Sequence, residues 1–547
     1  KNQKKATEEA RLVEEWVQFM IDSQSQQQVL DDEEDKSETT DIQWMIPPPN
    51  VTSYECVIHA WIRTGTLNGL LRAQEWFYKL SQEHLRTCRE EPNQNNDEGT
   101  AARMSNWYKP TVETIHPILF GWANFLEQQA DACHESSQES FALATPLIVE
   151  DWIFKMYKGK KNNLLDTAVM SAPILAWRNF LKKQNLVITI DNTHQKSSAE
   201  EFGIYTRRMA MTRCIEWIDT MESLDENDCC LEEGQSFTVH PSAYAYTIDA
   251  IASAIGISHD EEAEEEGMKC LFKVMDMLSI NIDSIQKDDS STKTTLKPTL
   301  LLRCLPLLYA QCIHHLNPIL QRRRNKEKQH HLNDNDTNNI EFSSSLSLDN
   351  ELLFRVEKML YSLTDGSIKR AKIEVGNPVS KLWNGDDHVL LAPRPNDCRF
   401  DTPNFPWVFH PPAINIANHY FHVEMLKYLK SPCSPHQRGD RIRVVMHVVE
   451  QLVSNSSDKD GVESSTEIWK EIMSCIGVIV VHQVERAEIL ENVYKKLVAS
   501  NSKKVDLEGL EDSVKKAMGK TRLAEDLIAK LRLLHQKPNI QESSMKA

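Results

Sequence analysis

The 547-residue sequence has few glycines, fewer basic than acidic residues and no long apolar run. With only 17 Gly, 40% hydrophobic and 26% charged residues, its composition is typical of a helical protein. No apolar stretch approaches the length that spans a bilayer, so we expect no membrane-spanning segment. Lys and Arg total 62 against 80 Asp and Glu, a net charge of -18. This balance counts against nucleic-acid binding, since a surface that neutralises phosphates carries excess cations.

The twelve cysteines are scattered, mostly in apolar stretches such as those of Cys56, Cys214 and Cys304. This pattern favours reduced thiols in an intracellular compartment over a disulfide framework. Pairs such as Cys433 with His436 are too isolated for zinc, which needs four ligands in paired spacing. We therefore expect neither a metal nor a cofactor.

Enzyme motifs are also missing from the sequence. Gly519-Lys520-Thr521 resembles the end of a phosphate-binding loop, but Val514 stands where that motif needs glycine, and the surrounding residues look helical. There is no GxGxxG, HExxH or GxSxG. These observations predict a protein that is not an enzyme.

What the sequence does contain is one hexapeptide pattern written four times: an acid, Trp, an apolar residue, two variable residues, then Met or Leu. The copies are EWVQFM from Glu15, EWFYKL from Glu75, DWIFKM from Asp151 and EWIDTM from Glu216. An apolar residue three positions before each Trp completes the 0, 3, 4, 7 spacing of one helical face. The pattern predicts that Trp152, Ile153 and Met156 lie in a core while Asp151 and Lys155 face solvent.

A second element recurs before several of these helices: Pro followed by a small polar residue, a typical helix start. It occurs at Pro49-Asn50, Pro110-Thr111 and Pro298-Thr299. In the helices that follow, a small residue precedes Trp, as in Gly121-Trp122, so that a neighbouring helix can approach closely. The clearest unit has a first helix at 51–63, a break at Gly65 and a second helix at 68–83.

Neither helix of such a unit can bury its apolar face alone. We therefore predict an all-α fold, an α-solenoid of stacked antiparallel helix pairs with disordered insertions. Residues 1–22 would be the second helix of a truncated repeat, with Val13, Trp16, Val17 and Met20 packed on the helix near Val51. Residues 23–48 read as an acidic linker, 49–465 as irregular repeats with polar insertions that include 322–350 and 365–404, and 466–547 as a C-terminal helical cap.

Residues 50–80, NVTSYECVIHAWIRTGTLNGLLRAQEWFYKL, resemble one pentatricopeptide repeat of the divergent kind found in algal organelle proteins. The resemblance covers this repeat well, 110–156 and 241–278 moderately, and the rest only in periodicity. It implies an α-solenoid that binds single-stranded RNA in an organelle, a mitochondrion rather than a plastid, for RNA processing, stability or translation. Because the sequence begins at Lys1, no targeting segment is visible in it.

The resemblance also implies which residues read bases. Carried over one by one, they are Glu55, Thr111, His116, Ser242, Thr247 and Thr299. Glu55 and His116 depart from the family's usual Asn, Thr or Ser, and Glu55 offers only acceptors. Phosphate-contact candidates come from basic clusters in the sequence: Lys155, Lys158, Lys160, Lys161, Arg178, Lys182, Arg207 and Arg208. An alternative function stays open, that of an acidic scaffold or subunit of a large organelle protein assembly with no RNA role.

Overall fold

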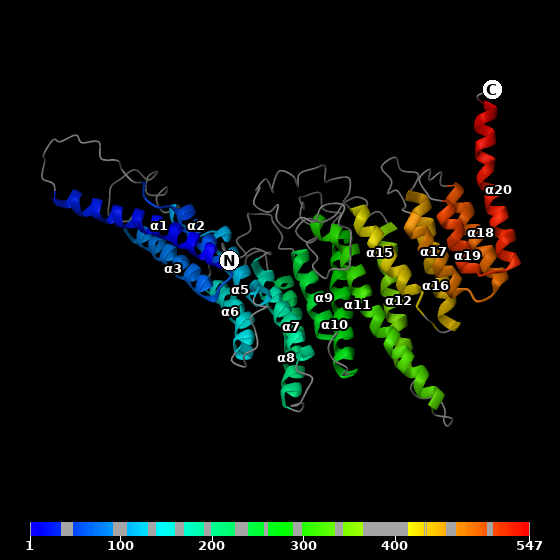
Figure 1. Cartoon of the computed structure of the whole chain (residues 1–547), viewed down its shortest axis with the longest axis horizontal. Helices are drawn as coiled ribbons and strands as arrows, with labels where there is room; N and C mark the ends of the chain where they lie inside the picture. Colours follow the sequence, from blue (N-terminus) through cyan, green and yellow to red (C-terminus); the bar gives the residue numbers. More distant parts are fainter. Residues whose placement is uncertain are drawn as a thin grey trace. The chain divides into compact units, whose positions relative to one another are not determined.

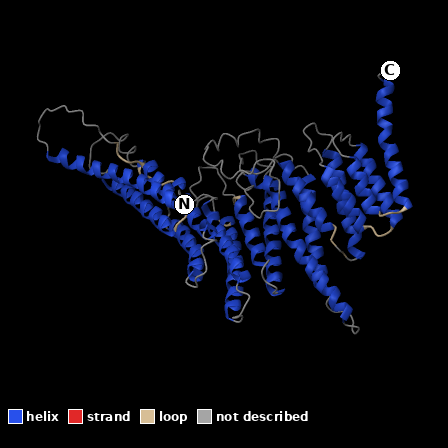
Figure 2. Ribbon diagram, in the orientation of Figure 1, coloured by secondary structure: helices blue, strands red, loops and turns tan. Residues whose placement is uncertain are grey.

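The computed structural model describes residues 2–33, 47–90, 107–128, 138–158, 169–190, 198–224, 239–255, 261–287, 298–333, 343–364, 414–431, 433, 435–455, 466–499 and 507–545. Its regular elements in these ranges are helices, without a strand, which confirms the predicted all-α class (Figure 2). The chain divides into two compact units, unit 1 over Lys1–Ser258 and unit 2 over His259–Ala547.

Unit 1 is built from helix pairs (Figure 1). Its helices are α1 Asn2–Glu33, α2 Val51–Ile62, α3 Leu67–Glu90, α5 Val112–Gln128, α6 Gln138–Lys158, the 3-10 turn η3 Val169–Ser171, α7 Ala172–Ile190, α8 Ser198–Glu222 and α9 Pro241–Ile255. We call α2, α5, α7 and α9 first helices, and α1, α3, α6 and α8 second helices. Each first helix packs against the next, α2 on α5, α5 on α7 and α7 on α9.

Unit 2 repeats this arrangement. Its helices are α10 Glu261–Lys287, α11 Pro298–Asn333, α12 Ser343–Thr364, α15 Ile414–Leu429, α16 Pro435–Asn455, α17 Thr466–Ile479, α18 Gln483–Ala499, α19 Leu507–Met518 and α20 Arg522–Met545. The first helices α11, α15, α17 and α19 pack in sequence, and so do the second helices α10, α12, α16, α18 and α20.

The predicted helix pair at 51–83 is present, but α3 continues to Glu90, seven residues past the predicted end. The Asn50 side chain accepts from the Ser53 amide at 3.0 Å and forms a capping box, so α2 begins where Pro49-Asn50 predicts. Gly65 takes a positive φ of 61° and turns the chain between α2 and α3. This turn lies three residues past Ile62, the last residue of α2, and α3 packs back against α2.

The small residue before Trp has the expected role. A Cβ on Gly121 of α5 would lie 2.9 Å from Leu70 of α3 and 3.1 Å from Ile62 of α2, so glycine is what lets α5 pack there. The adjacent Trp122 is buried, as are Trp61 and Trp177 at the equivalent positions. These tryptophans fill the layer between neighbouring pairs.

The repeated hexapeptide is core, with one exception. Trp152, Ile153 and Met156 are buried while Asp151 and Lys155 are exposed, as predicted. For α1 the prediction is wrong in part: α1 packs on α2 and Val17 is buried, but Trp16 is 68% exposed. Val13 and Met20 are half-buried. Trp16 is exposed because the Trp side chain at this position points toward the preceding second helix and not toward the following first helix.

Several predicted boundaries also need correction. α1 extends over Asn2–Glu33, so the first part of the segment expected as an acidic linker is helical. α11 extends to Asn333 and includes Arg322 to Arg324, which we expected in a polar insertion. The remaining insertions, such as 365–404, lie outside the described residues.

The C-terminal residues 466–547 were expected to cap the array, yet their helices pair like those before them. α17 packs on α19, and α18 packs on α20. Gly519, with φ 70°, separates α19 from α20 as Gly65 separates α2 from α3. The Thr521 hydroxyl accepts from the Ala524 amide at 3.2 Å, and the Thr66 hydroxyl accepts from the Gly69 amide at 2.9 Å. These helices therefore continue the pattern of alternating first and second helices.

Candidate functional site

A line of polar contacts joins three successive first helices of unit 1. The Asn179 amide of α7 donates to the Ala123 carbonyl of α5 at 2.9 Å. Its neighbour Arg178 donates through Nη1 to Asn179 Oδ1 at 3.1 Å and through Nε to Asp249 Oδ2 of α9 at 2.5 Å. All three polar side chains are buried. Buried polar groups are stable only when hydrogen-bonded, so this line fixes α5, α7 and α9 in register.

Two cations share the one carboxylate in this line. Lys182 Nζ lies 2.9 Å from the same Asp249 Oδ2 that Arg178 binds. The Arg178 guanidinium also lies 5.7 Å from the centre of the Tyr246 ring. Two of the predicted phosphate contacts are thus brought together, but their charge is partly neutralised by a residue that sequence reasoning missed.

The predicted base-reading residue Glu55 has structural partners. Its Oε1 accepts from the Thr114 hydroxyl at 2.7 Å and from the Thr111 hydroxyl at 3.5 Å. Glu55 lies on α2, whereas Thr111 precedes α5 and Thr114 lies in its first turn. The contact therefore joins two neighbouring first helices, and it brings together two of the predicted base-reading residues.

The other base-reading candidates lie in different surroundings. His116 is half-buried with its ring stacked on Phe120 at 4.2 Å. Ser242 and Thr247 are fully buried, and the Ser242 hydroxyl contacts His240 Nδ1 at 2.7 Å. Thr299 lies in the first turn of α11, and its side chain is outside the described residues. Sequence position on a first helix therefore did not ensure an accessible side chain.

The remaining phosphate-contact candidates that the structure describes do not lie on first helices. Lys155 is exposed on α6 and pairs with Asp151 at 2.5 Å. Arg207, buried, and Arg208, half-buried, lie on α8. Lys158 ends α6 without a described side chain, and Lys160 and Lys161 lie outside the described residues. In the described part of the chain, these cations do not join Arg178 and Lys182 on one surface.

A contact that the sequence reasoning missed occurs twice in unit 1. Glu150 of α6 accepts hydrogen bonds on one carboxylate oxygen from the indoles of Trp177 and Trp217, at 2.8 and 2.7 Å. Glu14 of α1 likewise accepts from Trp61 at 2.9 Å and Trp76 at 3.1 Å. Each glutamate precedes its own hexapeptide Trp by two residues, and that shared spacing is the signal that could have revealed it.

Unit 2 has a buried ionic cluster around Asp349 of α12. Arg441 of α16 donates to its Oδ2 at 2.9 Å, Arg324 of α11 also binds it, and the Tyr428 hydroxyl of α15 donates to its Oδ1 at 2.9 Å. Burial, with the Asp349 charge, raises the pKa of Tyr428 well above its ordinary value. Arg441 also donates to the Ser431 carbonyl at 2.7 Å. The cluster thus ties together four helices.

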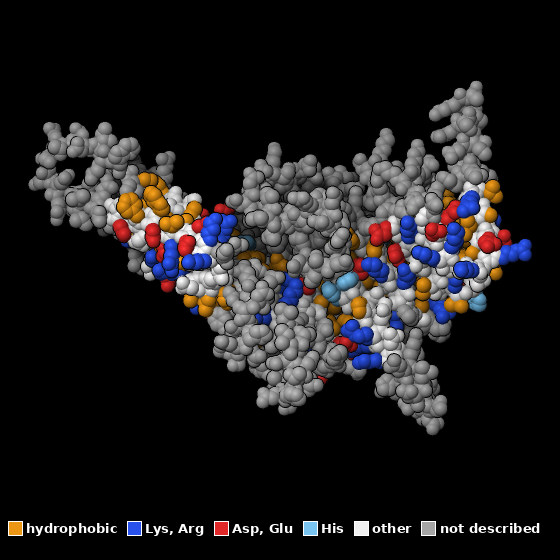
Figure 3. Space-filling view, viewed as in Figure 1, with side chains coloured by type: hydrophobic (Ala, Val, Ile, Leu, Met, Phe, Trp, Pro, Cys, Tyr) orange, Lys and Arg blue, Asp and Glu red, His pale blue; other side chains and the backbone are white. Residues whose placement is uncertain are grey.

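Exposed ion pairs connect the second helices of unit 2. In each, an acid on one helix meets a base on the next: Asp276 with Arg355 at 2.7 Å, Glu357 with Arg443 at 3.2 Å, Glu450 with Lys496 at 3.0 Å and Glu491 with Lys530 at 2.8 Å. Figure 3 shows acidic and basic side chains interspersed over the α16 to α20 part. Basic residues here stabilise the stack rather than form a separate positive patch.

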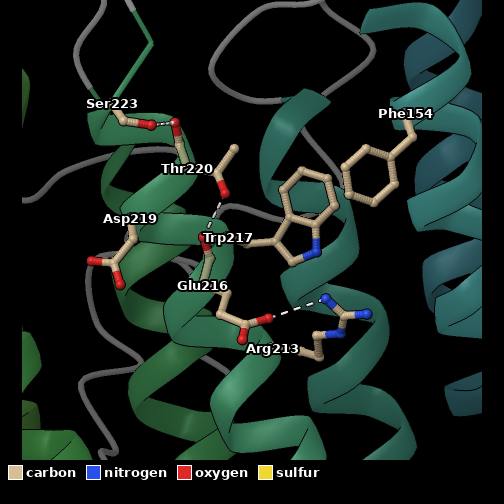
Figure 4. A pocket seen from close by; sticks show the side chains of 7 residues that line it. All are labelled: Phe154, Arg213, Glu216, Trp217, Asp219, Thr220 and Ser223. Atoms are coloured by element: carbon tan, nitrogen blue, oxygen red, sulfur yellow. Dashed lines mark hydrogen bonds and ion pairs between the residues drawn. The ribbon is translucent and has the colours of Figure 1, made fainter. Parts of the chain in front are cut away.

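A surface depression lies beside α8 of unit 1 (Figure 4). The Trp217 and Phe154 rings, 5.3 Å apart, form its apolar side, and Arg213, Glu216 and Asp219 surround them. Arg213 pairs with Glu216 at 3.1 Å. The depression therefore offers an apolar floor with charges of both signs around it.

Cysteines in the described residues are free thiols. Burial raises the pKa of Cys475 to about 12 and that of Cys270 to about 11, so neither forms a reactive thiolate at neutral pH. Within the described ranges, no group of three or more His, Cys, Asp or Glu residues could hold a metal ion, and no helix is long and apolar enough to cross a membrane. Gly519 to Thr521 form a turn between two helices, not the continuous helix that we expected there.

Neither models of known protein families nor curated proteins give a match to this chain.

Proposed function

We propose that the protein is a helical-repeat scaffold, of a divergent pentatricopeptide-like kind, that holds a protein partner along its first helices. The observation that carries this proposal is the pairing of cations on those helices. Arg178 and Lys182 share Asp249, Lys427 pairs with Glu424 at 2.7 Å, and Lys430, directly after α15, pairs with Glu471 of α17 at 2.9 Å. Each base meets a carboxylate, which suits a protein surface of mixed charge better than a chain of phosphates.

The surroundings of the predicted base-reading residues also support a protein partner over RNA. Reading a base needs a side chain that can reach it and present donors and acceptors. Glu55 is bonded to the next helix, and Ser242 and Thr247 are buried. Single-stranded RNA, which the family resemblance favours, is the competing ligand and the contrary outcome of the test.

The test compares the whole protein with two charge variants. Asp249→Asn removes the carboxylate that Arg178 and Lys182 share on the first helices, while Asp151→Asn removes an equal charge that pairs with Lys155 on a second helix. Binding to a random single-stranded RNA pool is measured by fluorescence anisotropy at low and physiological salt. We expect no salt-dependent binding by the wild-type protein, and a gain only for Asp249→Asn.

Crosslinking in cells provides the second measurement. We expect a fixed set of proteins to be recovered with the wild-type chain and lost with Lys427→Glu, whereas Lys155→Glu retains them, because only Lys427 lies on a first helix. Recovery of RNA above background, with tight salt-sensitive binding by the wild-type protein, would overturn the scaffold proposal. An organelle fraction is the place to look, since the resemblance predicts a mitochondrial protein.

A further inference from the structure

Large exposed apolar side chains form one row along α3 and a second row along α6. Each row uses the positions five residues before and two residues after the hexapeptide Trp, which we call the outward positions. Their side chains are 43% to 48% exposed: Leu71 and Tyr78 on α3, and Leu147 and Phe154 on α6. Leu85, 51% exposed, continues the α3 row at the same seven-residue spacing. Because seven residues make about two helical turns, each row lies along one side of its helix.

The two rows lie side by side in unit 1. The Tyr78 ring of α3 lies 5.8 Å from the Trp152 ring of α6, and the Phe154 ring of α6 lies 5.3 Å from the Trp217 ring of α8. Trp152 and Trp217 are buried, so an outward residue of each helix covers the Trp of the next and leaves part of its own ring exposed. The five residues of the two rows together form a surface that we call the apolar strip. Grouped exposed apolar residues of this kind mark interaction surfaces.

The apolar strip ends at the depression beside α8 (Figure 4). Phe154 belongs to both, and the buried Trp217 ring lies next to it in the depression. Arg213 and Asp219 stand at the rim. An apolar floor with a polar rim is the kind of site in which a large side chain of a protein partner is anchored.

Stacking of the second helices does not require apolar outward residues. In unit 2 other buried residues hold the Trp position: Met359 of α12, Val448 of α16 and Val493 of α18. One outward residue of α16 is Arg443, which pairs with Glu357 of α12 at 3.2 Å. The other is Glu450, which pairs with Lys496 of α18 at 3.0 Å. Since ion pairs serve at these positions in unit 2, the apolar residues of α3 and α6 need another explanation.

Charges beside the apolar strip indicate the class of partner. They form pairs three or four residues apart on the same helix: Arg72 with Glu75, Asp151 with Lys155, and Arg213 with Glu216. These pairs carry both signs without an excess of either. An anionic lipid surface or a nucleic acid is attracted by excess cations. A protein segment that carries both signs beside an apolar face complements such a surface better.

We propose that the apolar strip binds an amphipathic α-helix of a partner protein, with apolar residues in a heptad pattern. Apolar rows at seven-residue spacing on neighbouring helices are the surface on which such a helix packs. One layer of its side chains packs at Leu71 and Leu147. The next layer packs at Tyr78 and Phe154, and a large side chain beyond it enters the depression. The site uses second helices alone, so it is separate from the surface proposed for the first helices.

The experiment uses the full chain and a fluorescein-labelled synthetic peptide of about 20 residues, long enough for a helix that spans both layers. The peptide has Leu at the two apolar heptad positions and Ala, Lys and Glu elsewhere, and a scrambled peptide of the same composition is its control. Fluorescence anisotropy measures binding. We expect saturable binding of the heptad peptide alone, nearly equal at low and high salt because the contact is apolar. Hydrogen exchange should slow in α3 and α6 on binding.

A double variant, Leu71→Gln with Leu147→Gln, tests the first layer. Both residues are exposed and Gln is a good helix former, so the fold should be kept, and circular dichroism and melting curves check this. We expect the double variant to bind the heptad peptide about tenfold more weakly or worse. Phe354→Gln is the matched control: Phe354 is an exposed outward residue of α12, but its neighbour at that position on α16 is Arg443. It should bind the peptide like the wild-type protein.

Three results overturn the proposal: absence of binding, equal binding of the scrambled peptide, and a double variant that binds as tightly as the wild-type protein. Two further measurements test other occupants of the strip. Vesicles of phosphatidylcholine and phosphatidylglycerol test a lipid surface, and sedimentation velocity tests a second copy of the chain. We expect neither vesicle binding nor self-association that the double variant abolishes, and either one would overturn the proposal. Lys427→Glu should leave peptide binding unchanged, which separates this test from that of the first helices.

Discussion

Units 1 and 2 use one sequence position in two chemical ways. Two residues before the Trp position, Glu14 and Glu150 of unit 1 accept from indoles of the following pair, whereas Glu357 and Glu491 of unit 2 accept from Arg443 and Lys530. The position therefore points toward the next second helix in both units. What differs is the donor that the next helix supplies.

These acids differ in how deeply they are buried. Glu150 is buried with two indole donors, whereas Glu14, which also accepts from two indoles, is half-buried like Glu357 and Glu491 beside their cations. Lys and Arg keep their charged ends in water, so their pairs stay near the surface. Hydrogen bonds to a buried charge contribute more to stability than exposed ion pairs. The same register therefore stabilises the stack more where the acid is buried than where it is exposed.

The largest effect is expected at the buried carboxylate of unit 2. Asp349→Ala leaves the guanidinium of Arg441, fully buried, without its counter-charge, and it removes a partner of Arg324. Breaking such a pair from one side costs about 3–5 kcal/mol in the free energy of unfolding. Urea denaturation of the whole chain measures this cost. Hydrogen exchange of α12 and α16 peptides shows whether the loss of stability is located at the cluster. Asp440→Ala, an exposed acid on α16, is the control; equal losses for the two variants would contradict the cluster's role.

Glu150→Ala should have the next largest effect and should affect unit 1 alone. It leaves two buried indole N–H groups without their acceptor, at a cost of about 2–4 kcal/mol. Hydrogen exchange should rise in α6, α7 and α8 peptides and stay unchanged in unit 2. Glu150→Gln keeps an acceptor and should lose less. The control is Glu216→Ala on the exposed face of α8, and the expectation fails if that variant is as unstable as Glu150→Ala.

A gain in stability is expected in α3, where the residue two positions before the Trp is not an acid. In α3 the equivalent residue is Gln74, which donates to Tyr78, and the buried indole N–H of Trp122 has no hydrogen-bond partner among the described residues. Gln74→Glu supplies a carboxylate in the register of Glu150, so the free energy of unfolding should rise by about 1 kcal/mol. Thermal unfolding checks this against Gln74→Ala. An unchanged or lower melting temperature for Gln74→Glu would show that the register alone does not place the acceptor.

The smallest effect is expected for the exposed pair at Glu491. Hydrogen bonds from Lys495 and Lys530 lower the pKa of Glu491, so its contribution is present above the unfolded pKa of about 4.3 and is lost as the pH falls through the folded value. Glu491→Gln should cost under about 1 kcal/mol at neutral pH, and nothing in strong salt. Unfolding at pH 7 and pH 3 measures the difference. A cost that persists at pH 3 would assign Glu491 a role other than charge.

The two regions also differ in how well their sequences predicted the structure. Around Asn50, Gly65 and Trp76 the helix bounds, cap and core were predicted, because each depends on residues within one turn of each other. Arg322 to Arg324 were placed in an insertion, since their charged run looks like a solvated segment. In the structure Arg322 pairs with Glu264, and Arg324 pairs with Asp349. Those partners lie 58 and 25 residues away in the chain.

The candidate site was predictable only in part. The basic residues Arg178 and Lys182 were recognised as candidates, but Asp249, which neutralises part of their charge, lies on another first helix. Likewise, the family resemblance singled out Glu55, while the contact with Thr114 depends on how α5 packs on α2. Electrostatic pairing depends on distance in space, which a sequence without homologues does not supply.

The sequence by itself determined the helices, their pairing and the recurring Trp position, because helical periodicity, caps and glycine turns are local properties of the chain. The tertiary structure decided which face each Trp covers, and thereby left Trp16 exposed and buried the other three. It also decided that the acid two residues before that position meets an indole in unit 1 and a cation in unit 2. The physical reason is that hydrogen bonds and ion pairs between helices need donor and acceptor within about 3 Å, and only packing brings them that close.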